Sequence, residues 1–139
     1  MQTGCIFCKI VNNELPSSQV YADDEVIAFL DIAPAAKGHA LVIPREHYAT
    51  LFDVPQNLAP ALFSATRRVG AALMRELGAE GINVMQNNYP AAGQVVFHVH
   101  WHIIPRFRGD GLSLWPQGAY ASMDEMRDTA ARIAAQVSD

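Results

Sequence analysis

Three of the five histidines in this chain occupy alternate positions of one short apolar segment, residues 97–105. The residues between them favour β-strands, and the order is His98, Val99, His100, Trp101, His102, Ile103. Because strand side chains alternate between two faces, the three imidazoles should share one face, about 6 to 7 Å apart. The apolar residues should then point into a core. The segment therefore predicts a strand with one buried face and one imidazole-bearing face.

A face of three imidazoles is unusual, because each ring carries a donor and an acceptor that must be satisfied. This segment alone leaves three interpretations open. The face is a solvated strand surface, a metal site with three histidine ligands, or a phosphate-handling site in which one imidazole is the nucleophile. Features elsewhere in the chain have to decide among them.

The composition is that of an ordinary globular chain. Half of the 139 residues are apolar and 17% are charged, and a chain of this length buries about two-thirds of its unfolded surface. No run approaches the ~20 apolar residues of a membrane span, and Met1–Cys5 lacks the basic and apolar parts of a signal peptide. We therefore expect a cytoplasmic protein whose residues 1–139 form one domain.

The charge of the chain limits its partners. A formal net charge of −4 argues against nucleic acid, which usually requires a basic surface. Small anions remain compatible with this charge, because backbone N–H groups and helix ends bind phosphate without net positive charge. The expected partner is a small molecule, with neither nucleic acid nor a membrane.

Cys5 and Cys8 are too close in the sequence to close a structural disulfide loop. In a reducing compartment such a C-x-x-C pair indicates half of a metal site first and a redox pair second. Zinc prefers four tetrahedral ligands, commonly two cysteines and two histidines. His47 and one histidine of the triplet would complete that set and leave two imidazoles for chemistry.

The hydrophobic pattern predicts four further strands, at residues 19–22, 26–31, 39–44 and 81–87. The first two should form a hairpin across an Asp-Asp-Glu turn. The third is almost continuously apolar, so it should be buried on both faces. The fourth should pair with the histidine strand, because a hairpin is the simplest connection between them.

The main helix is predicted over residues 57–77, where apolar side chains recur every three or four positions. Asn57 is the expected N-cap, which places Pro60 in the first turn, where its missing N–H does no harm. Gly78 should end the helix.

A last helix should start at the capping box formed by Ser122 and Glu125 and carry apolar residues along one side as far as Val137. Together these elements predict an α+β fold. Its antiparallel sheet has about five strands and is accompanied by one long helix and a C-terminal helix. Residues 109–139 form a C-terminal loop and helix outside the part that carries the motifs.

Four separate segments resemble the histidine-triad (HIT) family of nucleotide hydrolases and transferases, in the family's order. The segment 93–104 is similar to its H-x-H-x-H-x-x signature. Three further segments resemble the Hint-like branch of this family: residues 5–10, residues 28–32 with Pro34, and residues 38–44 with His47. The resemblance covers about residues 5 to 108 and implies the HIT-like fold.

The resemblance implies a role for each histidine. His100 would attack the α-phosphorus of a nucleotide, and His102 would hydrogen-bond the phosphate and the leaving group. His98 would orient the strand and, with Cys5, Cys8 and His47, hold a structural zinc. His39 would support the catalytic face.

The resemblance also implies a nucleotide-binding set. Asp31 would hold the ribose hydroxyls, although an acidic residue at a strand end is often only a cap. The base pocket would be lined by Phe7, Phe29 and Ile32, which are otherwise ordinary core residues. Asn87 and Gln94 would belong to the substrate-binding residues, with the Asn87 amide near the phosphate or leaving group.

The chain departs from the family's pattern at Val95, where relatives carry a hydroxyl or a carboxylate. Valine can neither donate to a leaving group nor accept from it, so leaving-group preference and rate are open. The resemblance further implies a homodimer that pairs the long helices and adjacent strands.

Neutral imidazole suits the proposed reaction. Its pKa is near 6.5, so at pH 7 most rings carry a free lone pair and can attack phosphorus without a separate base. The expected activity is cleavage of purine nucleotide phosphoramidates or dinucleoside polyphosphates through a nucleotidyl-histidine, releasing a nucleoside monophosphate. Two alternatives remain: a zinc-dependent hydrolase with the metal on the face of His98, His100 and His102, and a nucleotide-binding protein with vestigial catalysis.

Overall fold

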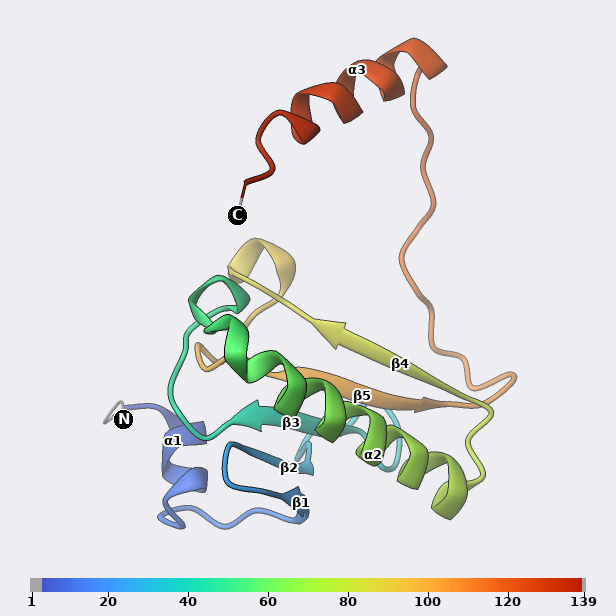
Figure 1. Cartoon of the computed structure of the whole chain (residues 1–139). Coiled ribbons are helices and arrows are strands. Elements are labelled where there is room, and N and C mark those ends of the chain that lie inside the picture. The colour runs from blue at the N-terminus through green and yellow to red at the C-terminus, as the bar shows by residue number, and fades with distance from the viewer. Residues whose placement is uncertain (1–3, 139) are drawn as a thin grey trace.

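The computed structural model describes residues 4–138, so Met1 to Thr3 of the segment inspected for a signal peptide lie outside the described residues. The chain forms a five-stranded antiparallel sheet in the order β1-β2-β3-β5-β4 (Figure 1). Its strands are β1 (Gln19–Ala22), β2 (Val26–Leu30), β3 (Ala40–Pro44), β4 (Gly81–Gln86) and β5 (Trp101–Arg106). The predicted antiparallel α+β fold is confirmed.

The predicted hairpin of β1 and β2 is present, and the side chain of Asp23 stabilises its turn. Its Oδ1 accepts hydrogen bonds from the backbone N–H groups of Glu25 and Val26, both at 2.8 Å. Every residue of β3 is buried, as the continuous apolar run predicts. The hairpin of β4 with β5 is also confirmed.

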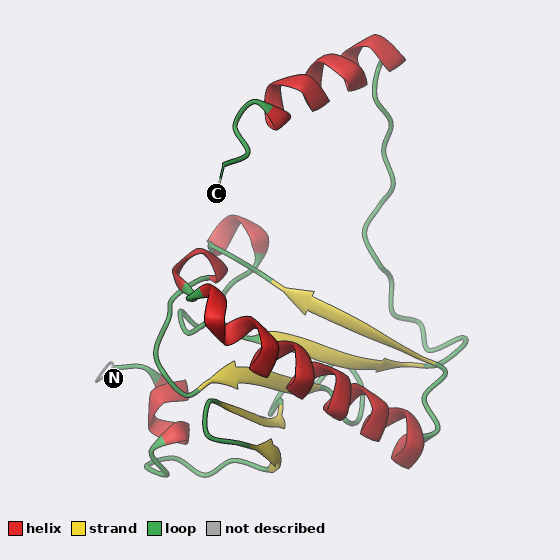
Figure 2. Cartoon of the chain, viewed as in Figure 1, coloured by secondary structure: helices red, strands yellow, loops and turns green. Residues whose placement is uncertain are grey.

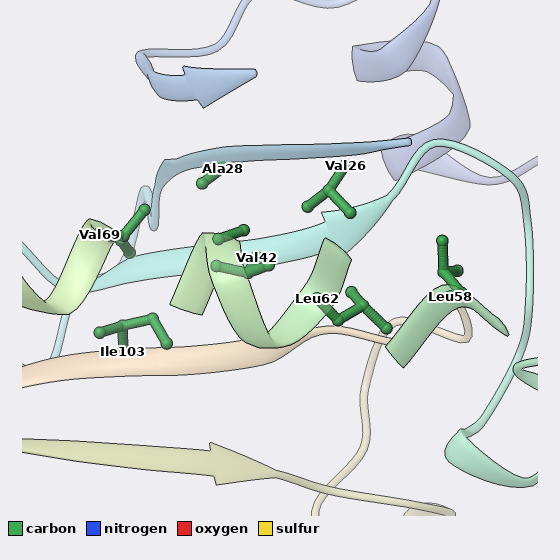
Figure 3. Packing of buried hydrophobic residues seen from close by; sticks show 9 residues of the cluster. Val26, Ala28, Val42, Leu58, Leu62, Val69 and Ile103 are labelled. Carbon is green, nitrogen blue, oxygen red and sulfur yellow. The ribbon is translucent and has the colours of Figure 1, made fainter. Parts of the chain in front are cut away.

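Helix α2 (Ala59–Leu77) covers one face of the sheet (Figure 3). Its residues Leu62 and Val69 belong to the same buried cluster as Val26, Val42 and Ile103, which come from three strands. Burying a side chain of this kind contributes roughly 1.5–3 kcal/mol. The spacing of apolar residues in the sequence therefore identifies the packed face of the helix correctly.

The prediction is wrong for the N-cap of α2 and right for its C-terminal end. A 3-10 turn, Gln56–Leu58, precedes the helix, so Leu58 is the N-cap and the prediction of Asn57 as the cap is wrong. The turn takes the place of a capping side chain, because the N–H groups of Leu58 and Ala59 donate to the carbonyls of Pro55 and Gln56. Gly78 ends the helix in the left-handed conformation, as predicted.

The opposite face of the sheet carries helix α1 (Ile6–Val11), which the sequence predicts only as a short apolar piece. Cys5 caps this helix by accepting a hydrogen bond from the Cys8 N–H. Phe7 of α1 packs with Ile27, Phe29 and Leu41 in a second buried cluster. The sheet thus separates α2 on one face from α1 on the other.

The C-terminal part leaves the sheet altogether (Figures 1 and 2). After β5 an extended arm of residues 109–122 leads to helix α3 (Met123–Ala134), which begins at the predicted cap. The Ser122 Oγ accepts a hydrogen bond of 3.1 Å from the Glu125 N–H. Within residues 4–138, no helix is both long enough and apolar enough to cross a membrane.

Candidate active site and metal centre

The histidine segment differs in one respect from the predicted strand. β5 begins at Trp101, so His102 lies in the strand, whereas His98 and His100 lie in the extended segment before it. The ladder ends there because Val99 donates its N–H to the Tyr48 carbonyl at 2.7 Å instead of to a neighbouring strand. The alternation nevertheless persists into this segment, since Val99 is fully buried and the imidazoles point to the side of α1.

Four side chains converge where the N-terminus of α1 meets the histidine segment. Cys5 and Cys8 come from the start of α1, His47 follows β3, and His98 precedes β5. One ligand atom from each lies within 4.8 Å of all the others. The Sγ of Cys5 is 3.5 Å from Nδ1 of His98, and the Sγ of Cys8 is 3.4 Å from Nδ1 of His47. These are the four residues that the resemblance assigns to a metal.

The geometry of this cluster fits a tetrahedral metal ion. Ligands bound to zinc at 2.0–2.3 Å lie about 3.3 to 3.8 Å from one another, and three sulfur–nitrogen distances within the cluster are 3.4, 3.5 and 3.6 Å. Nε2–H of His98 donates to the Pro44 carbonyl at 2.8 Å, which leaves the Nδ1 lone pair facing both sulfurs. Burial lowers the pKa of His98 to about 4, which keeps the ring in the neutral, ligand form.

His100 presents a free nitrogen on the same side of the sheet. Its Nδ1–H donates to the His98 carbonyl at 2.7 Å, so the lone pair of the neutral ring is on Nε2. Among the described residues Nε2 has no hydrogen-bond partner and no buried side-chain nitrogen is left unpaired, so Nε2 reaches solvent. Burial lowers the pKa of His100, which favours the neutral ring. His100 therefore has the form that a nucleophile requires.

His102 is fixed in the opposite tautomer by a chain of hydrogen bonds. The Ala35 N–H donates to Nδ1 of His39 at 2.9 Å. Because an N–H can only donate, this Nδ1 is an acceptor, and the proton of the neutral His39 ring lies on Nε2. That Nε2–H donates to Nδ1 of His102 at 2.9 Å, which places the proton of His102 on its own Nε2. Burial lowers the pKa of His102 to about 4 and also lowers that of His39. His102 is thus a neutral donor, 5.0 Å from His100 between ring centroids.

The two further arrangements of possible metal ligands do not fit an ion as well. Among the described residues, nitrogens of His98, His100 and His102 do not converge within 4.8 Å. Asp31, His39 and His102 do converge, with 3.6 Å from Asp31 Oδ2 to His39 Nε2. However, the Ala35 amide keeps a proton on that Nε2, so it has no lone pair for an ion. The geometry favours a metal at the cysteines and a phosphate-handling face at His100.

The residues expected around a base and ribose lie in different environments. Phe7 and Phe29 are buried, in edge-to-face contact at 5.4 Å, and the Phe7 ring is 5.2 Å from that of His100. Asp31 is half-buried, and its Oδ1 accepts from the Ala33 N–H at 2.9 Å. Ile32 is fully exposed. The structure therefore brings Phe7 and Asp31 to the histidine face and leaves Ile32 facing solvent.

Gln94 has a structural task in the loop before the histidines. Its amide donates to the Ala49 carbonyl at 2.7 Å, and its Oε1 accepts from the Tyr89 N–H at 2.8 Å. Tyr89 has a φ of 71°, a strained conformation for a residue with a side chain. The side chain of Gln94 is therefore committed to holding this loop rather than open to a ligand.

Asn87 and Val95 flank the same loop. The Asn87 amide nitrogen lies 3.9 Å from the position that a Cβ on Gly93 would occupy. Val95 is 85% exposed and borders a hollow of about 490 Å³ that also reaches Cys5 and His47. The Cys5 and His47 side of the four-residue cluster is thus accessible from the side of Val95.

Sequence reasoning misses the groups that set the tautomers. They are the backbone carbonyls of Pro44 and His98 and the backbone N–H of Ala35. Every residue has a backbone carbonyl and every residue except proline has a backbone N–H, so no residue type signals them. Only the folded geometry shows which ones face an imidazole.

Residues 12–109 match the HIT domain family. The chain is 45% identical over 114 residues to "Protein hit" of Bacillus subtilis, covering 81% of this chain and 79% of that protein. It is 43% identical over 115 residues to the adenosine 5'-monophosphoramidase hnt1 of Schizosaccharomyces pombe, covering 81% and 84%. It is 41% identical over 112 residues to the adenylylsulfatase HINT3 of Arabidopsis thaliana, covering 81% and 57%. The chain belongs to the HIT family.

Solved structures match the whole chain. The crystal structure of SMU.412c from Streptococcus mutans has a TM-score of 0.93 at 38% identity, covering 99% of this chain and 88% of that one. Because residues 109–139 are more than a fifth of this chain, a score this high includes the arm and α3. A Zn-bound histidine triad family protein from Mycobacterium smegmatis has a TM-score of 0.76 at 34% identity, covering 96% and 98%. The fold is that of HIT proteins.

Proposed function

We propose that this chain is a nucleotide hydrolase or transferase that forms a covalent nucleotidyl-histidine at His100. The proposal rests mainly on one observation, the pairing of opposite tautomers at the site. His100 offers a lone pair on Nε2, and its neighbour His102 offers a proton on Nε2. A nucleophile beside a hydrogen-bond donor is the arrangement that phosphoryl transfer needs.

In the proposed first step, His100 Nε2 forms a bond to the α-phosphorus as the bond to the leaving group breaks. His102 Nε2–H donates to a phosphate oxygen or to the leaving atom as negative charge develops there. The imidazole becomes cationic, which strengthens the hydrogen bond from its Nδ1–H to the His98 carbonyl. In the second step water forms the new P–O bond as the P–N bond breaks, and a proton of that water passes to solvent. His100 returns to its neutral form with Nδ1–H in place, and the nucleoside monophosphate is released.

The substrate class follows from the relatives. Those named adenosine 5'-monophosphoramidase and adenylylsulfatase support an adenosine nucleotide, but their names differ in the group released. An experiment should therefore compare an adenosine phosphoramidate, adenylylsulfate, and diadenosine tri- and tetraphosphate with the same enzyme sample. Turnover of at least one to AMP is expected. Val95 leaves a further candidate open, tight AMP binding without turnover, and the absence of any product burst in a single-turnover reaction would favour it.

The Cys5, Cys8, His47 and His98 cluster is proposed to hold a structural zinc ion. The ligand type, the fit to tetrahedral spacing and the Zn-bound relative support this metal. Zinc bound there would cross-link α1 to the segment that carries His100, which fixes the nucleophile relative to Phe7. The two free cysteines are also consistent with the reducing cytoplasm, where we propose that the protein acts.

Asp31 is proposed to bind the ribose hydroxyls, because its half-buried carboxylate lies beside His39 at the histidine face. In Asp31→Asn we expect kcat/KM for a ribonucleotide substrate to fall about tenfold or more, since one strong acceptor for a hydroxyl is lost. The 2′,3′-dideoxy analogue should lose little. Equal losses for both substrates would indicate that Asp31 supports His39 instead of the ribose.

We also propose a homodimer that pairs α2 and β4. β4 is an edge strand, and Val84 and Met85 on it are 51% and 42% exposed, with Phe63 of α2 66% exposed. Exposed apolar residues along an unpaired edge are typical of an interface. Val84→Asp should shift the mass in solution from dimer to monomer, measured by sedimentation at micromolar concentration. A wild-type monomer would contradict the proposal.

A further inference from the structure

Helix α3 has no packing partner among the described residues of its own chain. None of its residues is buried, and its ion pairs, Arg127 with Asp124 and Arg132 with Asp128, lie within the helix. Met126 and Ile133 lie on one side, 44% and 61% exposed. A helix of 12 residues is marginal in water without tertiary contacts. An amphipathic helix of this length therefore requires a surface to cover its apolar side.

The body of the chain offers such a surface. A groove of about 550 Å³ lies between the C-terminal half of α2 and the hairpin of β1 and β2. Its lining is mostly apolar and includes Val20, Leu30, Ala72 and Leu73. Val20 is 50% exposed and Leu30 is 38% exposed, so the described chain leaves both partly uncovered. Amphipathic helices commonly bind in grooves of this kind.

The charges around the groove suit α3. Two of the three charged residues that line it, Lys37 and Arg68, are basic. The first two turns of α3 carry three acidic residues, Asp124, Glu125 and Asp128, and one basic residue, Arg127. An acidic helix end beside a basic rim is electrostatically favourable and helps to set the orientation of the helix.

The position of α3 points to the groove of another molecule. The groove lies at the β1 edge of the sheet, whereas the arm carries α3 past the opposite edge, at β4 (Figure 1). Residues 109–122 can reach about 45 Å when extended. A five-stranded sheet is about 19 Å wide between its edge strands. The arm is therefore long enough to cross a second sheet that lies beyond β4.

We propose that two copies of this chain exchange their arms, so that α3 of each copy docks into the apolar groove between α2 and β1–β2 of the other. The arm and helix occupy a similar position in the solved Streptococcus mutans chain, so the detached conformation is not peculiar to this sequence. The inference extends the homodimer proposed above. The exchange explains why a helix with an exposed apolar side stands apart from the body.

The arm exchange is tested by amide hydrogen–deuterium exchange of α3 in the full-length protein, with mass spectrometry as the readout. Two pairs of adjacent exposed alanines provide matched variants. Ala72→Asp places a charge in the groove and Ala71→Asp places one beside it; Ala130→Asp lies on the apolar side of α3 and Ala131→Asp lies off it. Exchange over residues 123–134 should be at least about tenfold faster in Ala72→Asp and Ala130→Asp than in wild type. It should change little in the two controls.

Mixing the two disruptive variants distinguishes exchange between copies from docking within one chain. A mixed dimer holds one intact pair, the groove of the Ala130→Asp chain with α3 of the Ala72→Asp chain. The α3 peptides of the two variants differ in mass, because only the Ala130→Asp chain is changed in α3. The protection of the unchanged α3 peptide, which comes from the Ala72→Asp chain, can therefore be followed separately. Recovery is the expected result.

Two results would overturn the exchange. One is fast exchange over α3 in the wild type. The other is a pair of findings: mixing the two variants does not restore the protection of α3, and dilution of the wild type does not weaken it. Together they would indicate docking within one chain. If the wild type is dimeric by mass in either case, the homodimer stands and only the arm exchange is lost.

Discussion

Replacing His100 by asparagine is expected to abolish turnover while leaving the nucleotide site able to bind. Asparagine has no basic lone pair at the position of Nε2, so no bond to phosphorus can form. Loss of a covalent nucleophile typically costs at least about 10⁴-fold in kcat. The His100→Asn protein should bind AMP with a Kd within about threefold of wild type, by calorimetry, because the binding groups remain. Turnover close to the wild-type rate would remove His100 from the mechanism.

His102→Asn provides the matched control for that variant. It removes the donor beside the phosphate but leaves the His100 lone pair in place. We expect a loss of about 10² in kcat, the usual effect of one missing donor to a developing charge. A loss as large as that of His100→Asn would mean that the two imidazoles have been assigned the wrong way round.

Replacing Cys8 by serine is expected to have the largest effect on stability. Cys8 is buried and its Sγ lies within 3.6 Å of Nδ1 of both His47 and His98, so the change removes one of the four proposed metal ligands. Binding free energy at a structural zinc site is also folding free energy. Loss of about 3 kcal/mol of it lowers Tm by roughly 10 °C in a chain of this size. Metal analysis and thermal unfolding of one purified sample measure both effects.

His102→Asn serves as the control for metal content, because His102 lies outside the cluster. It should retain one zinc per chain, whereas Cys8→Ser should hold less than about a tenth of that. If Cys8→Ser kept its zinc and His102→Asn lost it, the metal would bind at the histidine face. That result would favour a zinc-dependent hydrolase.

Periodicity was sufficient to predict most of the sheet and the buried face of α2. The alternation of His98, Val99 and His100 separates core from site even where the strand itself has ended, because the backbone stays extended. The end of the ladder could not be predicted, since it depends on a hydrogen bond to Tyr48, far away in the sequence. Asn57 failed as a cap for a similar reason, because backbone groups of a preceding turn took over that task.

The site shows the same division between side chains and backbone. The residue types predict a ligand set and a nucleophile, because sulfur and imidazole chemistry is specific. They do not reveal which nitrogen of each ring is free, since backbone groups of Ala35, Pro44 and His98 decide it. The role of Gln94 was also hidden, because an amide serves equally well as a loop brace or a ligand contact. The detached position of α3 has no counterpart in its own sequence pattern.

The most direct test of the proposed mechanism is the mass of the enzyme during a single turnover. Wild-type protein in excess over a substrate that it turns over should be quenched in acid-free conditions within milliseconds and digested. The account predicts one nucleotidyl group on the peptide that contains His100, appearing before the nucleoside monophosphate and disappearing as it forms. Release of the monophosphate with no adduct at any time, or an adduct on His102 instead, would contradict it.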